Sequence, residues 1–347
     1  MNPVLPSTQS LVTTPEHVHI NNDRLEAIAQ EWAPSEFKIP AWDFPPYPAS
    51  DERIVDFLFW GNTINFCFTN FAASDTENVK YTVEFEGKPQ EGSSAMWASL
   101  RKAVTAYGDQ ALTGTFWRDI SNARAREIFQ GIDRAHDIPM YEERRQILHD
   151  VGDVLATRYA RQDGGTFSTF IESCKQHGEL RLYTNRGGYD PNGLLAMLIQ
   201  EMPSFQDNWE TKDNHIVEFN KRAQLAAAMA WGRSQNRDGT LFAPVDIKEM
   251  TVFADYTLPK VLRALGVLEY NAPLAETVDI RNVIPAGSQE ELEIRASTVH
   301  AADRLITRIN TIASKDIHAV HMDYKIFSAG RKMSNTAPHH YTTTTAY

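Results

Sequence analysis

Apolar side chains recur every three or four residues over most of the chain after residue 94, which is the spacing of amphipathic helices. The strongest such segment runs from Glu142 to Tyr159. Another begins near Leu258, where Pro259 suits the first turn of a helix. A capping box from Ser288 to Glu291 opens a long helix. The spacing predicts helices over residues 22–32, 96–107, 124–131, 140–161, 167–177, 191–202, 215–232, 258–268, 288–313 and 317–330.

Strand patterns are confined to an earlier part of the chain. Residues 79–86 alternate apolar and polar positions, and Gly87-Lys88 and residues 89–92 suit a turn and the returning arm of a hairpin. The apolar runs 57–60 and 63–68, on either side of Gly61-Asn62, predict two buried strand-like segments.

These patterns predict a mainly α (α+β) protein with one compact domain over residues 21–330. Its small β element covers about residues 57–93, and its helical body covers about residues 94–330. Residues 1–20 are polar and rich in proline, serine and threonine, so we expect them to be loose. Residues 331–347 lack periodicity, and we expect a disordered tail.

Charge and cysteine content narrow the class of protein. The 347 residues include 34 Lys and Arg against 45 Asp and Glu, a net charge of −11, which opposes stable binding to the phosphate backbone of a nucleic acid. A small anionic ligand stays compatible with this balance. Two cysteines, Cys67 and Cys174, fit a reducing compartment. With no signal peptide and no apolar run long enough for a membrane span, we expect a cytoplasmic monomer.

Three charged residues stand at unusual positions. Asp255 lies between Phe253 and Tyr256, just before a predicted helix, where the helix dipole keeps a carboxylate ionised at neutral pH. The alternative is that Asp255 is an ordinary N-cap of that helix. Lys221 falls on an apolar stripe, either as a functional group or as a lysine whose stem covers apolar surface. Arg295 interrupts another apolar stripe and needs an anionic partner, either a structural carboxylate or a ligand phosphate.

Several common chemistries lack their motifs in this sequence. It contains no glycine-rich phosphate loop, no GxSxG elbow and no calcium loop, and the His318/His321 pair has no accompanying CxxC or HExxH, so we expect no metal and no cofactor. A carboxylate at the start of a helix, an inward lysine and nearby aromatic rings suit cleavage of a bond that develops positive charge on a sugar.

Six segments, in order and with similar spacing, resemble the queuosine salvage proteins, which are queuosine 5′-phosphate N-glycosylases. The segments are Thr63–Phe68, Met202–Asp207, Lys221–Gln224, Thr251–Tyr256 with Leu258-Pro259, Glu293–Arg295 and Met322–Tyr324. The resemblance implies a fold related to the helix-hairpin-helix DNA glycosylases. It also implies hydrolysis of queuosine 5′-monophosphate to queuine and ribose 5-phosphate, for queuine salvage toward tRNA modification.

The resemblance also implies roles for individual residues. Lys221 and Asp255 are paired in the active site, with Asp255 stabilising an oxocarbenium ion or activating water. The residues expected to bind substrate are the aromatic Phe66, Phe205, Phe253, Tyr256 and Tyr324, the polar Asn65, Asp207 and Asp323, and the cationic Arg295, with Arg222 or backbone N–H groups as alternatives for the phosphate.

The sequence departs from the family pattern at Thr69, Thr257, Lys325 and Phe327, which puts the detail of the substrate in question more than the reaction. Two other functions stay open: a non-catalytic protein that binds queuine or a nucleotide, in which Lys221 and Asp255 form a structural ion pair, and a glycosylase acting on bases in nucleic acid.

Overall fold

The computed structural model describes residues 2–71, 79–161, 163–183, 193–237, 239–333 and 338–347. Its α-helices are α1 Val4–Thr13, α2 Asn22–Trp32, α3 Ile54–Thr63, α4 Ser93–Tyr107, α5 Gly114–Asp119, α6 Asn122–Phe129, α7 Tyr141–Arg158, α8 Phe167–Ser173, α9 Leu194–Glu201, α10 Lys221–Gln235, α11 Thr257–Ala264, α12 Ala272–Asp279, α13 Gln289–Ala313 and α14 Ala319–Lys332. Its strands are β1 Val18–Ile20, β2 Thr82–Phe85, β3 Lys88–Glu91, β4 Asn208–Glu210, β5 Ile216–Glu218 and β6 Leu268–Tyr270.

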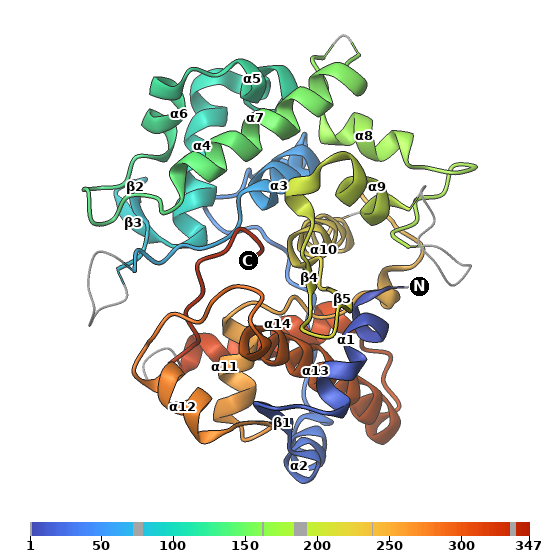
Figure 1. Ribbon diagram of the computed structural model, residues 1–347. Coiled ribbons are helices and arrows are strands. Elements are labelled where there is room, and N and C mark those ends of the chain that lie inside the picture. The colour runs from blue at the N-terminus through green and yellow to red at the C-terminus, as the bar shows by residue number, and fades with distance from the viewer. Residues whose placement is uncertain (1, 72–78, 162, 184–192, 238, 334–337) are drawn as a thin grey trace.

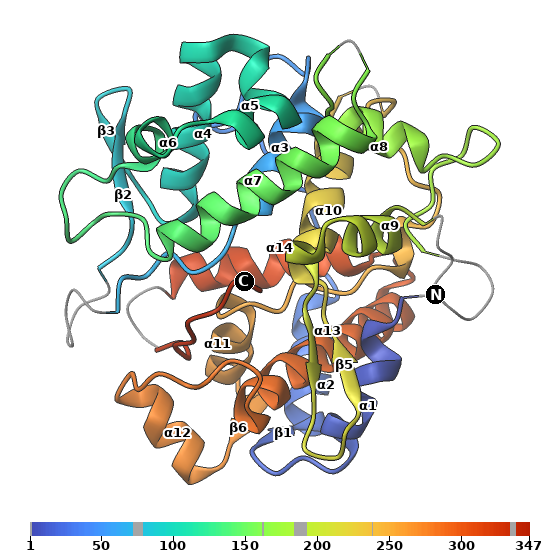
Figure 2. The ribbon, with the colours of Figure 1, turned by 45° about the horizontal axis from the view of Figure 1, so that its top comes forward.

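The helices gather in two halves. Helices α4 to α8 lie in one half, and α1, α2, α11, α12 and α13 lie in the other (Figure 1). Helix α10 packs on α3 between them, and the turned view in Figure 2 gives the same division. Buried apolar side chains from both halves belong to one continuous core. The prediction of a mainly helical fold is confirmed.

The strands form three antiparallel pairs: β1 with β6, β2 with β3, and β4 with β5. The predicted hairpin is present as β2 and β3, although β2 is shorter than the alternating pattern. Strand β5, which pairs with β4, lies just before α10 and within the range 215–232 that we predicted to be helical throughout. The helix begins only at Lys221, after Asn220 takes a left-handed conformation with φ of 51°.

The prediction of a buried strand over residues 57–60 is wrong, because these residues belong to helix α3. Every residue from Phe57 to Thr63 is buried, so the helix has no polar face and shows no helical period in the sequence. Gly61 lies where α3 meets α4: a Cβ on this residue would come within 1.7 Å of the Trp97 ring. Residues 64–68 continue as irregular chain, with Cys67 left-handed at φ of 38°.

Both ends of the chain also differ from prediction. Residues 4–13 form α1, whose Val4 and Leu11 are buried, and β1 pairs with β6, so the prediction of a loose segment is wrong for residues 2–20. Residues 338–347 lie between the two halves (Figures 1 and 2), where the Ile284 N–H donates to the Tyr341 carbonyl at 2.7 Å. The predicted disorder is therefore wrong for residues 338–347, while residues 334–337 lie outside the described residues. The buried residues of α1 do follow helical spacing, at Val4, Thr8 and Leu11, whereas residues 338–347 have no periodicity of their own.

Candidate active site

Lys221 and Asp255 meet at the first turns of two helices. Lys221 is the first residue of α10, and Asp255 stands two residues before α11. The Lys221 Nζ lies 3.8 Å from Asp255 Oδ2, and the two side chains are 6% and 20% exposed. The structure thus brings together the two residues that the resemblance pairs.

The Asp255 carboxylate has a different partner on each oxygen. Its Oδ1 accepts the Thr257 N–H at 2.6 Å, which holds the carboxylate at the start of α11. Its Oδ2 faces Lys221. Asp255 is not the N-cap of α11, a position that Tyr256 holds, but one of its oxygens accepts a backbone N–H at the start of the helix and the other faces the lysine.

Asp323, on α14, adds a second carboxylate to this site. Its Oδ2 accepts the Phe253 N–H at 3.0 Å. Burial, with a smaller contribution from the negative charge of Asp255, raises the pKa of Asp323 to about 7, although the Phe253 N–H and Lys221 act in the opposite direction. Burial lowers the pKa of Lys221, against the attraction of Asp255 and Asp323. One lysine therefore faces two carboxyl groups, one of which titrates near neutral pH.

Arg295 is occupied by protein carboxylates. It donates two parallel hydrogen bonds to Asp207, at 2.9 and 2.5 Å, and a third to the Ala254 carbonyl at 3.2 Å. Glu291, one turn earlier on α13, lies 3.5 Å away. Of the two partners considered from the sequence, the structure has the structural carboxylate. Neither Arg295 nor Asp207, which are both fully or almost fully buried, faces open space.

Asp207 also anchors the start of α10. Its Oδ2 accepts the backbone N–H of Lys221 at 3.1 Å, and its Oδ1 accepts the Trp209 indole N–H at 3.1 Å. The neighbouring Arg295 guanidinium lowers the pKa of the Asp207 carboxyl despite its burial. Asp207 was predicted to bind substrate; in the structure its carboxylate is used by Arg295 and by the backbone of Lys221.

Arg222 and the residues around it form structural contacts. Arg222 is buried and donates to the backbone carbonyls of Thr63 and Ser204. The ring of Phe66 lies between the guanidinium groups of Arg222 and Arg144, at 5.1 and 4.2 Å, and Phe205 lies 5.4 Å from Arg222. Both rings are almost completely buried, so they support the wall of the site from behind.

The remaining predicted site residues lie at different depths. Asn65 is buried and donates to the Asn62 side chain at 3.0 Å. Phe253 is buried, whereas Tyr256 and Tyr324 are half-buried. Tyr256 lines a hollow in the described part of the chain.

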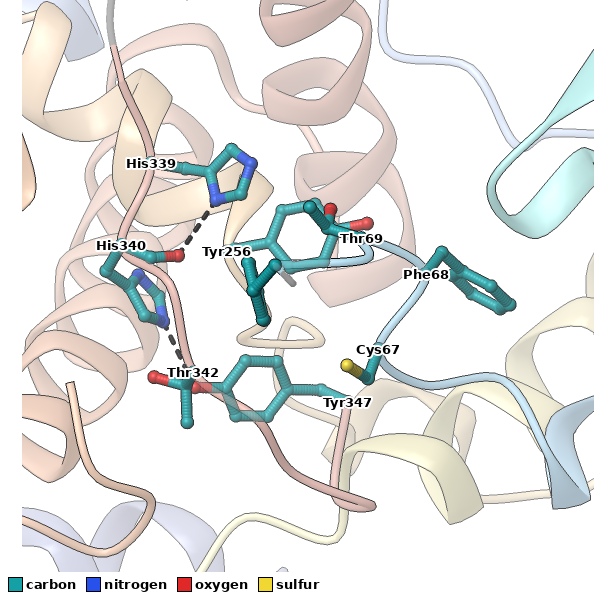
Figure 3. Close-up of a pocket in the computed structure, with 9 residues that line it drawn as sticks. Cys67, Phe68, Thr69, Tyr256, His339, His340, Thr342 and Tyr347 are labelled. Atoms are coloured by element: carbon teal, nitrogen blue, oxygen red, sulfur yellow. Dashed lines mark hydrogen bonds between the residues drawn. The ribbon is translucent and has the colours of Figure 1, made fainter. Parts of the chain in front are cut away.

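This hollow, shown in Figure 3, encloses about 250 Å³ of empty space, part of it open to solvent. The side chain of Tyr256 stacks on His339, with ring centroids 4.6 Å apart. The other lining residues are Cys67, Phe68, Thr69, Phe71, His340, Thr342 and Tyr347.

Four of these lining residues belong to the segment 338–347, which was predicted to be a disordered tail and supplied no predicted site residue. The segment has no period, because each of its residues meets a different neighbour. One feature of the sequence could have indicated that this segment is ordered. Four consecutive residues with ring side chains, Pro338-His339-His340-Tyr341, precede a stretch that is rich in threonine. Burial lowers the pKa of His339 to about 4 and that of His340 to about 3, so both imidazoles are neutral at pH 7.

The fold and the site define a mainly helical protein with a buried lysine–carboxylate centre at two helix starts. The family model of the queuosine salvage protein matches residues 46–347. The chain therefore belongs to the queuosine salvage protein family, as the six segments indicated.

Several relatives carry the same name, queuosine 5′-phosphate N-glycosylase/hydrolase. The protein from Sphaerobacter thermophilus is 30% identical over 346 residues, which are 99% of this chain and 97% of that protein. The Mus musculus protein is 26% identical over 289 residues, 82% of this chain and 78% of its own length. The Schizosaccharomyces pombe protein is 25% identical over 287 residues, 81% and 76% of the two chains.

Two further observations concern the described residues only. None of their helices has the length and apolar character needed to cross a membrane. No three histidine, cysteine, aspartate or glutamate side chains among them come together as a set that could hold a metal ion.

Proposed function

We propose that this protein hydrolyses the N-glycosidic bond of queuosine 5′-phosphate and releases queuine and ribose 5-phosphate, which supplies queuine for tRNA modification. The name shared by the relatives supports the substrate and the reaction. The observation that carries the proposal is the Lys221–Asp255 pair, 3.8 Å apart at the starts of two helices.

In the proposed reaction, the bond between the sugar C1′ and the base nitrogen breaks, and its electron pair leaves with the base. The sugar becomes an oxocarbenium ion. The Asp255 carboxylate either stabilises this cation or activates the water that attacks it. Water adds to C1′ and loses a proton, and the base gains one. Lys221 orients Asp255, because its Nζ lies 3.8 Å from Asp255 Oδ2.

The base is proposed to lie next to Tyr256, with Phe253 and Tyr324 in the adjoining wall. Asp323 suits the donors of the guanine-like ring or the ammonium group of queuine, because it is a partly exposed carboxyl group beside Asp255 and Lys221. Arg295 and Arg222 are committed to protein oxygens. Backbone N–H groups are therefore the remaining choice for the phosphate among those considered from the sequence.

The setting of the enzyme is also part of the proposal. The net charge of −11 supports a free nucleotide as the substrate, without stable binding of nucleic acid. We propose a cytoplasmic monomer whose helical body is related to the helix-hairpin-helix DNA glycosylases. Light scattering on the purified protein and titration with a labelled oligonucleotide test the oligomeric state and the nucleic-acid partner.

The decisive experiment measures free queuine by mass spectrometry after incubation of the purified protein with queuosine 5′-monophosphate. Guanosine 5′-monophosphate and the variant Asp255→Ala serve as controls. We expect queuine from the wild type with its own substrate, and neither guanine from the control nucleotide nor queuine from the variant. Binding of queuine without release from the nucleotide would replace the hydrolase with a binding protein.

A further inference from the structure

The segment 338–347 packs on chain segments that also hold the proposed catalytic pair. Tyr347 and His340 are each 3% exposed. The Cys67 N–H donates to the Tyr347 carbonyl at 2.9 Å, which ties the segment to the irregular chain after α3. In Figure 3 the Tyr347 side chain lies across the hollow from Thr69 and Tyr256.

The Tyr347 hydroxyl is the first member of a buried chain of polar contacts. It donates to Glu291 Oε1 at 2.8 Å, and Glu291 lies 3.5 Å from Arg295. Arg295 holds both oxygens of Asp207. Asp207 in turn accepts the backbone N–H of Lys221. Each member of this chain has its next partner within ionic or hydrogen-bond distance.

The aromatic ring of Tyr347 adds a second constraint on the same guanidinium. Arg295 lies between two rings, 3.9 Å from the centroid of Phe219 and 4.6 Å from that of Tyr347. Both faces of the guanidinium are therefore covered, and its edge is used by carboxylates and a carbonyl. A planar group confined in this way has little freedom to turn.

We propose that Tyr347 is a positioning residue for the reaction: it holds Glu291 against Arg295 and, through Asp207, sets the first residue of α10, from which the Lys221 side chain reaches Asp255. This role rests on the proposed function of the Lys221–Asp255 pair. Tyr347 acts without touching the reacting atoms, because three side chains separate it from the Lys221 backbone.

The charges around Glu291 explain why the hydroxyl matters. Burial has the largest effect on the pKa of Glu291 and raises it, and the charge of Asp207 raises it further. Arg295 and the Tyr347 O–H lower this pKa. The Gly287 N–H also donates to this carboxylate, at 3.2 Å. His340 is neutral, and its Nε2 lies 3.1 Å from the Tyr347 oxygen. Without the hydroxyl, Glu291 takes up a proton at higher pH and its attraction for Arg295 is lost.

The test is Tyr347→Phe, which keeps the ring over Arg295 and removes only the donor. Thr343→Ala is the matched control, because Thr343 is exposed on the same segment. For queuine release we expect kcat to fall about 2- to 10-fold, less than the about 10- to 100-fold usual for a residue in direct contact with a functional group, because three side chains intervene; KM should change less than about twofold. The acid limb of the kcat profile should move to higher pH, and Thr343→Ala should match the wild type.

A second readout does not depend on the substrate. Hydrogen exchange at the Lys221 amide should accelerate in Tyr347→Phe, because its acceptor Asp207 is held less firmly. If Tyr347→Phe does not fold, Glu291→Gln serves instead, since it can still accept the hydroxyl but carries no charge for Arg295. Unchanged exchange at Lys221 in the folded variant, or unchanged kcat where the wild type is active, overturns the positioning role. If the wild type releases no queuine, the proposed function is wrong. The hydrogen-exchange measurement then still shows whether Tyr347 helps to hold the Lys221 backbone.

Discussion

The substitution Asp255→Asn tests the core of the proposed reaction with little change in shape. The asparagine side chain has the same size as aspartate, and its amide oxygen can still accept the Thr257 N–H that Asp255 Oδ1 accepts at 2.6 Å. The start of α11 should therefore be kept. What the substitution removes is the negative charge that faces Lys221.

The size of the effect follows from Coulomb's law. If the sugar cation forms about as far from Asp255 as Lys221 Nζ is now, 3.8 Å, the two unit charges attract each other. At about 4 Å and an effective dielectric constant of about 20, that attraction is about 4 kcal/mol. Since about 1.4 kcal/mol corresponds to a tenfold change in rate, kcat should fall about 1,000-fold. The side chain is 20% exposed, and screening by water reduces the expected loss to between about 100- and 1,000-fold.

The assay is the steady-state release of queuine from queuosine 5′-monophosphate, with circular dichroism to confirm that the variant is folded. Asp279→Asn is the matched control, because Asp279 is 52% exposed and pairs with Arg263 on the surface. The control should retain the kcat of the wild type. A folded Asp255→Asn enzyme with kcat within about tenfold of the wild type would refute the electrostatic role of Asp255.

Three further substitutions test other parts of the structure. Asp207→Asn leaves Arg295 buried with a weaker partner, so urea denaturation should show a loss of about 3–5 kcal/mol of stability, and a loss below about 1 kcal/mol would contradict the buried pair. The pKa of Asp323 is raised in the folded state from 3.8 to about 7, so between these pH values the folded protein holds a proton that the unfolded chain has lost. The wild type should therefore lose stability as the pH rises from about 4 to about 7, and Asp323→Asn should remove this pH dependence from the thermal midpoint. Parallel curves of thermal midpoint against pH for the two proteins would refute the assignment. Leu11→Ala should cost about 2–5 kcal/mol in urea denaturation if α1 is part of the core, whereas a loose N-terminus would show no change.

Local pattern was sufficient wherever an element has one buried face and one polar face. Helix α13 begins at Gln289 after Ser288, whose side chain accepts the Glu291 N–H; this is one half of the predicted capping box, since the Glu291 carboxylate accepts the Gly287 N–H instead. Helix α11 begins at Thr257, close to the predicted start, and the β2–β3 hairpin follows its alternating residues. In each case the signal comes from neighbouring residues, so it is present before the chain folds.

Pattern failed where burial is uniform or where contacts are distant. Helix α3 is buried on every side and has no period, and the 338–347 segment is held by neighbours more than 50 residues away along the chain, such as Glu291 and Cys67. Lys221 was placed within a longer helix, although the preceding residues 216–218 pair with β4 instead. The structure at such positions depends on contacts between segments that are distant in the sequence. The local spacing of apolar residues does not determine those contacts.

The candidate site divides in the same way. The sequence by itself identified Lys221, Asp255 and Arg295 as out of place, because charged groups at apolar positions or helix starts need partners. The resemblance had already paired Lys221 with Asp255, which lie 3.8 Å apart in the structure. Only the tertiary structure decided the partners of Arg295, which are Asp207 and Glu291. It also brought His339 onto Tyr256 and Tyr347 onto Arg295. The need for a counter-charge is a property of a residue type and its local setting, whereas the identity of that counter-charge depends on long-range packing.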